Sequence, residues 1–316
     1  MGSVHVLSRR QFLIVASATA TGLTLGACSS KNNATSTPAS KAEFSTQIAT
    51  DIDSTIAHPT VRPAVVPIFP TMISVEAGTF AMGSEVGYRV EKPVHRVTIS
   101  RPFSIGVYAV TYQEYDKYTE DIQKSIVNIG VADRGTHPVS GVDWYGAVEY
   151  CNWLSEKAGL TPCYSGGGKV TKCDFLADGY RMPTEAEWEF AAQGGVESQG
   201  YLYSGSNDPG EVGWHAGNSG GKAHPVGQKK PNELGIYDMS GNRWEWCWDW
   251  FEGEYYQSSP EIDPTGPLTP PSGSFVNRSR RSSSAVQEVD TLRVAFRSYD
   301  GVSYPGDNGM RLVRSV

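Results

Sequence analysis

Three helices are predicted by polar capping residues and by the apolar positions that follow them. Thr111 and Glu114 have the spacing of a capping box, in which each side chain hydrogen-bonds to a free backbone N–H of the first turn. Thr184 and Glu187 repeat this pattern ahead of a second apolar run. Asp143 has the position of an N-cap for a third helix. The apolar face of that helix comprises Trp144, Ala147, Val148, Cys151 and Leu154, and Gly159 ends it.

Elsewhere the helical period disappears. Polar and apolar residues alternate from Val94 to Ile99 and from Arg293 to Arg297, which predicts two strands. The stretch from Gly194 to Pro231 has no period and is rich in Gly, Asn and Pro. A loop of this length needs support from a bound metal, disulfides or aromatic anchors. The 34 Gly, 19 Pro, 8 Trp and 16 Tyr favour a loop-rich fold held by large aromatic side chains.

The first 28 residues have the features of an export signal rather than of a folded element. Arg9 and Arg10 precede an apolar stretch from Phe12 to Ala27, which is too short and too polar for a membrane span of about 20 apolar residues. The segment resembles a twin-arginine signal. Residues 25–28 resemble a lipobox, which predicts lipidation of Cys28; an ordinary cleaved signal with a chance cysteine is the alternative.

The predicted organisation is therefore a signal peptide at 1–28, a flexible tether at 29–62 and one folded domain at 63–316. The tether is rich in Ser, Thr, Ala, Asn and Lys. We expect an exported lipoprotein. Its acyl chains would anchor it to the outer membrane or the cell surface. The net charge of −7 does not indicate the general excess of basic residues that is typical of nucleic-acid-binding proteins.

Four cysteines follow the predicted lipidation site. Cys163 and Cys173 flank a Gly-rich turn, and they either form a disulfide in an oxidising compartment or remain free thiols. Cys151 and Cys247 lie among aromatic residues, which favours a packing role.

Several long motifs occur in one order along the predicted domain: Gly78–Ser84, Pro93–Val97, Tyr108–Thr111, Tyr150–Ser155, Gly179–Glu189, Asn232–Trp246 and Gly309–Val313. From about Ile73 to the C-terminus, this series resembles the formylglycine-generating-enzyme (sulfatase-modifying factor) family. The resemblance implies an α+β domain with little regular secondary structure, the formylglycine-generating-enzyme type of C-type lectin fold.

The resemblance also implies a structural Ca²⁺ at the family's Gly-Asn-x-Trp-Glu-Trp motif. Asn242 and Glu245 match the motif, and their oxygens are hard ligands that suit calcium. The alternative is that both side chains hydrogen-bond to nearby backbone. Arg243 departs from the small or apolar residue that is usual at its position.

The enzymes of this family bind copper through two cysteines just before an Arg-x-Ala-x-Arg motif, which is Arg293–Arg297 here. By spacing, the two cysteine positions fall near Ser284 and Val289, and no cysteine follows Cys247. Since Cu(I) requires soft thiolate ligands, we expect no copper and no sulfatase-activating oxidation. No other catalytic motif stands out, and an enzyme or accessory factor of an exported pathway is the alternative.

The C-terminal segment 278–311 is the predicted ligand-binding region. It is rich in Tyr, Ser, Asp and Gly, a composition typical of adaptable binding loops. It also resembles the variable proteins of diversity-generating retroelements, because every residue from Ser298 to Asn308 can arise from an AAC or AAT codon by changing its first two bases. The alternative is a surface loop that drifted after catalysis was lost. The predicted binding residues are Ser284, Val286, Glu288, Asp290, Phe296, Ser298, Tyr299, Asp300, Val302, Ser303, Tyr304, Asp307 and Asn308.

We expect a macromolecular ligand, most simply a protein, with Tyr299 and Tyr304 as anchors. A structural role in the envelope is a further alternative. Sugar binding ranks below protein binding, because the Glu-Pro-Asn and Gln-Pro-Asp motifs of calcium-dependent lectins are absent.

Overall fold

The computed structural model describes residues 65–124, 134–271 and 276–316. Cys28 and the predicted signal peptide and tether lie outside the described residues, so these predictions and the boundaries drawn from them stay predictions. None of the helices among the described residues combines the length and apolarity that crossing a membrane requires.

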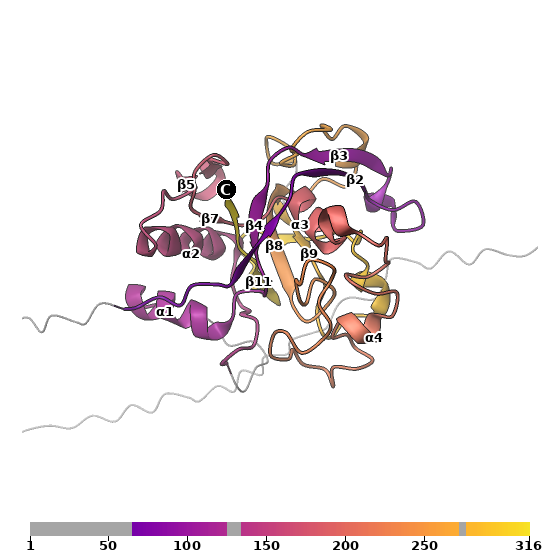
Figure 1. Cartoon of the computed structure of the whole chain (residues 1–316). Coiled ribbons are helices and arrows are strands. Elements are labelled where there is room, and N and C mark those ends of the chain that lie inside the picture. The colour runs from indigo at the N-terminus through magenta and orange to yellow at the C-terminus, as the bar shows by residue number, and fades with distance from the viewer. Residues whose placement is uncertain (1–64, 125–133, 272–275) are drawn as a thin grey trace, which may run out of the picture. The chain divides into compact units, whose positions relative to one another are not determined.

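Two four-stranded sheets carry the domain (Figure 1). The first has the order β1-β4-β12-β7, with β1 at Met72–Val75, β4 at Phe103–Gly106, β12 at Val313–Ser315 and β7 at Tyr180–Arg181. The second has the order β10-β9-β8-β11, with β10 at Ser298–Gly301, β9 at Asn277–Arg281, β8 at Trp244–Trp250 and β11 at Asn308–Met310. Two smaller pairs join β2 (Gly78–Met82) to β3 (His95–Ile99) and β5 (Tyr164–Ser165) to β6 (Lys172–Cys173).

The described residues form four α-helices: α1 at Tyr112–Ile122, α2 at Trp144–Lys157, α3 at Glu185–Ala192 and the single turn α4 at Pro209–Val212. In Figure 1, α1 and α2 lie to one side of the strands and α3 and α4 to the other. The part of the chain that the structure describes also contains five 3₁₀ turns: η1 at Arg89–Glu91, η2 at Gly168–Val170, η3 at Gly195–Glu197, η4 at Tyr255–Gln257 and η5 at Val289–Leu292.

The three predicted helix starts are confirmed. Capping boxes at Thr111 and Thr184 open α1 and α3, and the Asp143 carboxylate accepts the Gly146 N–H at 2.7 Å to open α2. The predicted strand at Val94–Ile99 is confirmed as β3. Local polar contacts are sufficient to define these ends, because the partners lie within one turn of each other.

The predicted strand at Arg293–Arg297 is wrong. These residues are irregular and follow η5, and the Phe296 N–H closes a turn on the Arg293 carbonyl at 2.9 Å. The alternation arises because both arginines point inward to distant acids. Arg293 binds Glu91 through two hydrogen bonds of 2.6 and 2.8 Å, and Arg297 binds Glu185.

Large aromatic side chains form much of the core. Trp144, Trp188 and Trp246 are fully buried, and each indole N–H has a partner. The indole of Trp144 donates to the Cys247 carbonyl at 3.0 Å, and that of Trp246 donates to the Val142 carbonyl at 2.8 Å. These bonds offset the cost of burying a polar tip on an otherwise apolar ring.

Aromatic contacts also support the long loop between residues 194 and 231. The ring of Trp214 stacks on His224 with centroids 3.8 Å apart, and the Lys229 ammonium lies 4.1 Å from the Trp214 centroid. The four cysteines among the described residues are free, and Cys151 and Cys247 are buried as expected of packing residues. Of the supports considered for this loop, aromatic anchoring is therefore the one observed.

Buried ion pairs join the C-terminal part of the chain to α3 and β8. Arg281 contacts Glu185 at 3.0 Å, and Arg297 contacts the same carboxylate at 2.8 Å. Arg311 pairs with Glu245 at 2.8 Å, and neither side chain is accessible to solvent. Because removing one partner would leave an uncompensated buried charge, these pairs hold the segment after residue 277 in one position.

Candidate functional site

The strand β10 presents the first part of the predicted binding segment. It pairs antiparallel with β9, with Tyr299 opposite Ser279 and Ser298 opposite Arg280. Ser279 is fully buried on the inner strand β9, whereas Tyr299 lies on the edge strand β10 and is 50% exposed. The Tyr299 ring packs on Phe251 with centroids 4.5 Å apart, so it is exposed but supported on one side.

Tyr304 is the second exposed aromatic residue of the segment, at 59% exposure. Its backbone N–H bonds to the Gly301 carbonyl at 2.9 Å, which closes the turn after β10. Gly306 has a φ of +40°, and a Cβ built there would lie 2.5 Å from the Tyr304 ring. The glycine therefore leaves the space that this ring occupies.

A partly buried polar network fixes the backbone beneath the two tyrosines. Arg280 donates from one nitrogen to Asp300 at 2.8 Å and to Asn308 at 2.9 Å. The Asn308 amide donates in turn to Asp300 at 3.1 Å, and the Arg280 guanidinium lies 4.4 Å from the Trp244 ring centroid. The base of the segment is thus rigid, while the tyrosines project from it.

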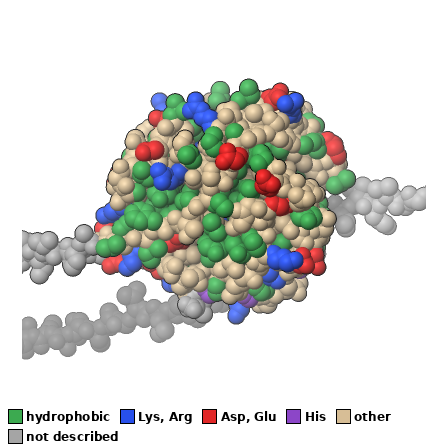
Figure 2. All heavy atoms as spheres, viewed as in Figure 1, with side chains coloured by type: hydrophobic (Ala, Val, Ile, Leu, Met, Phe, Trp, Pro, Cys, Tyr) green, Lys and Arg blue, Asp and Glu red, His purple; other side chains and the backbone are tan. Residues whose placement is uncertain are grey.

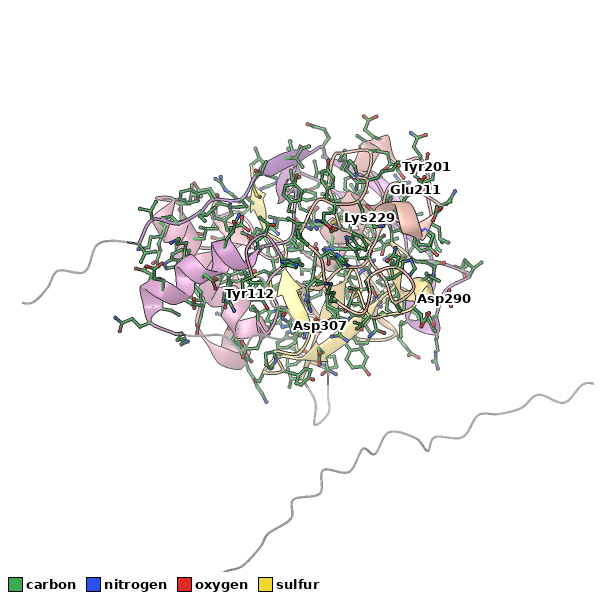
Figure 3. The ribbon with its side chains drawn as sticks, turned by 90° about the horizontal axis from the view of Figure 1, so that it is seen from below. Tyr112, Tyr201, Glu211, Lys229, Asp290 and Asp307 are labelled. Atoms are coloured by element: carbon green, nitrogen blue, oxygen red, sulfur yellow. The ribbon has the colours of Figure 1, made fainter. Side chains whose placement is uncertain are left out.

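A second contact ties the end of the segment to β8. Asp307 accepts from both the Arg243 guanidinium and the Ser284 hydroxyl. In Figure 3, Asp307 and Asp290 are labelled at opposite sides of the yellow C-terminal ribbon. Arg243, whose presence departs from the family pattern, therefore acts as an anchor for the binding segment. The sequence alone shows the unusual residue but does not identify its partner.

The backbone at Ser282 and Ser283 is in the left-handed region, with φ of +77° and +97°. Side chains other than Gly rarely adopt it, and each such residue costs on the order of 1 kcal/mol or more. The Ser282 hydroxyl is within 2.9 Å of the Gly241 carbonyl, and the Ser283 hydroxyl is 2.6 Å from the Thr291 hydroxyl. These contacts hold the turn that leads into Ser284.

The predicted binding residues differ in how far solvent reaches them. Those that are exposed are Val286, Glu288, Asp290, Tyr299, Ser303 and Tyr304. Those that are partly exposed are Phe296, Ser298, Asp300 and Asp307. Ser284, Val302 and Asn308 are buried in the structure, so their role as ligand contacts stays a prediction that their burial does not favour. The composition of a loop does not reveal which of its side chains face inward.

Asn242 and Glu245 do not fit a calcium ion. The Asn242 side chain bonds to both backbone groups of His224, at 2.9 and 3.1 Å. Both Glu245 carboxylate oxygens already accept hydrogen bonds. One accepts from Arg311, and the other accepts from Arg311 and from the Trp188 indole. Within residues 65–124, 134–271 and 276–316, no group of three or more His, Cys, Asp or Glu could hold a metal ion. Glu245 instead serves as the counter-charge of Arg311.

Residues 284 and 289, near which the resemblance places the family's catalytic cysteines, are Ser and Val. Ser284 is buried against Asp307, and Val289 begins η5. Cys163 and Cys173 are free thiols, although Tyr164, which follows Cys163, lies opposite Cys173 in the β5–β6 pair. Burial raises the pKa of the Cys163 thiol, which lowers its reactivity.

Comparisons with known proteins agree with this architecture. The family model described as a sulfatase-modifying factor enzyme 1-like domain matches residues 58–316. The chaperone protein LppX of Paenibacillus barcinonensis is 35% identical over 277 residues, which cover 77% of this chain and 89% of LppX. A formylglycine-generating enzyme of Thermomonospora curvata is 34% identical over 268 residues, covering 63% and 78% of the two chains.

Among solved structures, Treponema denticola variable protein 1 superposes with a TM-score of 0.66 at 31% identity, covering 78% of this chain and 95% of that protein. The predicted α+β, formylglycine-generating-enzyme type of C-type lectin fold is thereby confirmed. The relatives carry names of an enzyme, a chaperone and a variable protein, so the fold does not decide the activity. The chain belongs to the family of sulfatase-modifying factor enzyme 1-like domains.

Proposed function

We propose that this protein is an exported lipoprotein that binds a protein ligand through the exposed residues of its C-terminal segment. The observation that carries the proposal is the contrast within this segment. Tyr299 and Tyr304 project into solvent, whereas Arg280, Asp300 and Asn308 fix the backbone below them. Exposed tyrosines on a rigid base give contact area at low entropic cost, which favours a binding surface.

The exposed part of the segment adds acidic groups to these aromatic anchors. Glu288 and Asp290 are exposed near Val286, which is itself 50% exposed. Neither acid forms an ion pair with another described residue. A partner with apolar and basic groups would complement this surface.

The similarity to Treponema denticola variable protein 1 supports a related proposal, that the segment is diversified. Every amino acid from Ser298 to Asn308 has at least one codon that randomising the adenines of AAC or AAT can produce. A reverse-transcriptase gene nearby, with a near-copy of the DNA that encodes residues 278–316, is the expected finding. Their absence from the locus would contradict diversification and leave the binding proposal standing.

We propose further that the chain is not a sulfatase-activating oxidase. Its last cysteine is Cys247, so no thiol is available at Ser284 or Val289 to bind Cu(I). Competition with a Cu(I) chelator should show no tight copper site. Conversion of a peptide cysteine to formylglycine by the purified protein would overturn this part of the proposal.

The binding proposal is tested with Tyr299→Ala/Tyr304→Ala. Candidate ligands are captured from exported and environmental proteins, then purified, and their Kd is measured with each variant. Loss of two anchors should raise Kd by a factor of about 30 or more, since such residues contribute about 2 kcal/mol or more. Tyr201→Ala is the matched control, because Tyr201 is also partly exposed, at 38%, and lies outside the segment.

Two results would contradict the proposal. One is unchanged affinity of the double variant for every captured ligand that the parent protein binds. The other is a fall in melting temperature far larger than that of Tyr201→Ala, because it would show that the tyrosines are core residues. A circular-dichroism melt of all three proteins distinguishes these cases.

An accessory role in an exported pathway is the second candidate. It is favoured by the similarity to LppX, whose name is that of a chaperone protein, across 77% of this chain. If this candidate is right, the purified protein should raise the recovered activity of an exported enzyme encoded beside it during refolding. The Tyr299→Ala/Tyr304→Ala variant would then show whether the same surface is used.

A further inference from the structure

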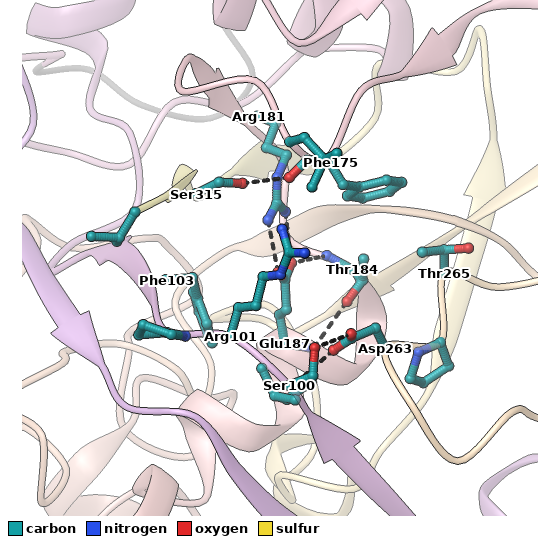
Figure 4. Close-up of a pocket in the computed structure, with 15 residues that line it drawn as sticks. Ser100, Arg101, Phe103, Phe175, Arg181, Thr184, Glu187, Asp263, Thr265 and Ser315 are labelled. Carbon is teal, nitrogen blue, oxygen red and sulfur yellow. Dashed lines mark hydrogen bonds and ion pairs between the residues drawn. The ribbon is translucent and has the colours of Figure 1, made fainter.

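A pocket of about 390 Å³ lies between the ends of β3, β4 and β12 and the start of α3. None of its lining residues belongs to the segment 278–311. Its volume is within the range of about 300–1,000 Å³ that is typical of small-molecule sites. Figure 4 shows its polar residues, with Arg101 extended among them.

Hydrogen bonds fix two walls of this pocket. On one side, the Asp263 N–H donates to the Thr98 carbonyl at 3.0 Å, and the Ser100 N–H donates to the Asp263 carboxylate at 2.8 Å. On the other side, the Ser315 hydroxyl donates to the Phe175 carbonyl at 2.7 Å. The space is therefore defined before a ligand enters, which reduces the entropic cost of binding.

The two acidic side chains of the pocket already have hydrogen-bond donors within the fold. Glu187 accepts two hydrogen bonds of 2.7 Å from Arg181 and a third from the Thr184 N–H at 2.8 Å. Asp263 accepts from the backbone and the hydroxyl of Ser100. Glu187 is therefore neutralised by Arg181, whereas Asp263 is held by the neutral groups of Ser100.

Arg101 is the cationic side chain of the pocket that has no bonded partner among the described residues, since Arg181 is paired with Glu187. It is exposed to solvent and has neither a hydrogen bond nor an ion pair with any other residue that the structure describes. The Thr265 hydroxyl is likewise without a bond to the described residues. A guanidinium offers a planar pair of N–H donors that matches a carboxylate, and a hydroxyl can supply one more donor.

The remaining walls are apolar. Phe103 is buried at the base, and Phe175 is held in place by the Arg181 guanidinium 5.1 Å from its centroid and by the edge of Trp248. Leu176 is 71% exposed at the rim. An apolar group of a ligand would cover the exposed parts of Phe175 and Leu176 and remove them from water.

We propose that this pocket binds a small organic monocarboxylate with an aromatic or aliphatic body. The carboxylate pairs with Arg101 and the body packs against Phe103, Phe175 and Leu176. Free carboxylic acids and the C-terminal residue of a peptide share this chemistry. The pocket shares no residue with the C-terminal binding segment. A negative result for one proposal therefore leaves the other standing.

The test measures binding of matched probes to the purified full chain by isothermal titration calorimetry. The first pair is 3-phenylpropanoate and its amide, and the second is acetyl-glycyl-phenylalanine and its amide. We expect at least one acid to bind about tenfold or more tightly than its amide, because the amide lacks the charge that Arg101 recognises. The acid that binds more tightly distinguishes a free acid from a peptide end.

Two variants assign the binding to this pocket. Arg101→Gln should weaken acid binding by about tenfold while leaving the melting temperature unchanged, since Arg101 has no described partner to lose. Arg96→Gln is the matched control, because Arg96 is an exposed arginine of β3 outside the pocket that pairs with Glu261. The proposal is overturned if neither acid binds at about 10 mM, if acids and amides bind equally, or if Arg101→Gln has no more effect than Arg96→Gln.

Discussion

Asp238→Asn is predicted to change the pH dependence of stability in a defined direction. Asp238 is buried, and burial raises the pKa of its carboxyl from 3.8 to about 6, although the hydrogen bond from the Gly227 N–H opposes the rise. In the unfolded chain the carboxyl ionises near its ordinary value. Between these two values the folded protein holds a proton that the unfolded chain has lost, so the free energy of unfolding falls as pH rises through this window.

The size of this effect follows from the pKa values. At about 1.4 kcal/mol for each pKa unit, the rise from 3.8 to about 6 corresponds to a loss of about 3 kcal/mol, which is complete above pH 6. Asparagine removes the charge and keeps an acceptor for the Gly227 N–H. It also tolerates the left-handed backbone here, where φ is +57°. Its new NH₂ group loses the weak 3.4 Å contact with the Asn242 amide, at a cost of about 1 kcal/mol.

We therefore expect Asp238→Asn to be more stable than the parent protein at pH 7.5, by about 1–3 kcal/mol, and no more stable at pH 4. Urea unfolding followed by tryptophan fluorescence at several pH values measures this. The difference between the two proteins isolates Asp238 from Asp249, whose pKa is also raised by burial. Asp290→Asn, which removes an exposed carboxylate, is the control. Parallel pH profiles for the parent protein and Asp238→Asn would refute the reasoning.

Three further predictions concern the buried ion pairs, the binding segment and the lipid anchor. Glu245→Gln leaves the buried Arg311 guanidinium without a counter-charge and should cost about 3–5 kcal/mol, measured by urea unfolding; a loss below 1 kcal/mol would show that the pair contributes little. Gly306→Ala should displace the Tyr304 ring, lowering stability by about 1 kcal/mol and weakening ligand binding, and a crystal structure with an unmoved ring would contradict this. Cys28→Ser should move the protein from the membrane to the soluble fraction, whereas retention in washed membranes would argue against lipidation at this residue.

The features that could be predicted from sequence are those whose partners lie close along the chain. The caps at Thr111, Asp143 and Thr184 satisfy backbone groups within three residues, and all three helices begin where these signals place them. The ordered series of family motifs supplied the fold class. Neither inference requires knowledge of which distant segments meet.

The features that could not be predicted depend on distant partners. The alternation at Arg293–Arg297 has the period of a strand, but it reflects two arginines whose acids lie 202 and 112 residues away. The Asn242–Glu245 pair matches a calcium motif, but Arg311 neutralises the carboxylate from 66 residues away. A local pattern cannot distinguish a side chain that awaits a ligand from one that the fold has already paired.

The order of the first sheet has a consequence for synthesis of the protein. The strand β12, at Val313–Ser315, lies between β4 and β7, whose residues are made far earlier. β4 therefore has no neighbour on that side, and β7 no partner in this sheet, until residues 313–315 have left the ribosome. Such long-range pairing delays folding, so the domain completes its architecture only after residues 313–315 have been translated, and nascent chains paused before residue 313 should remain sensitive to protease.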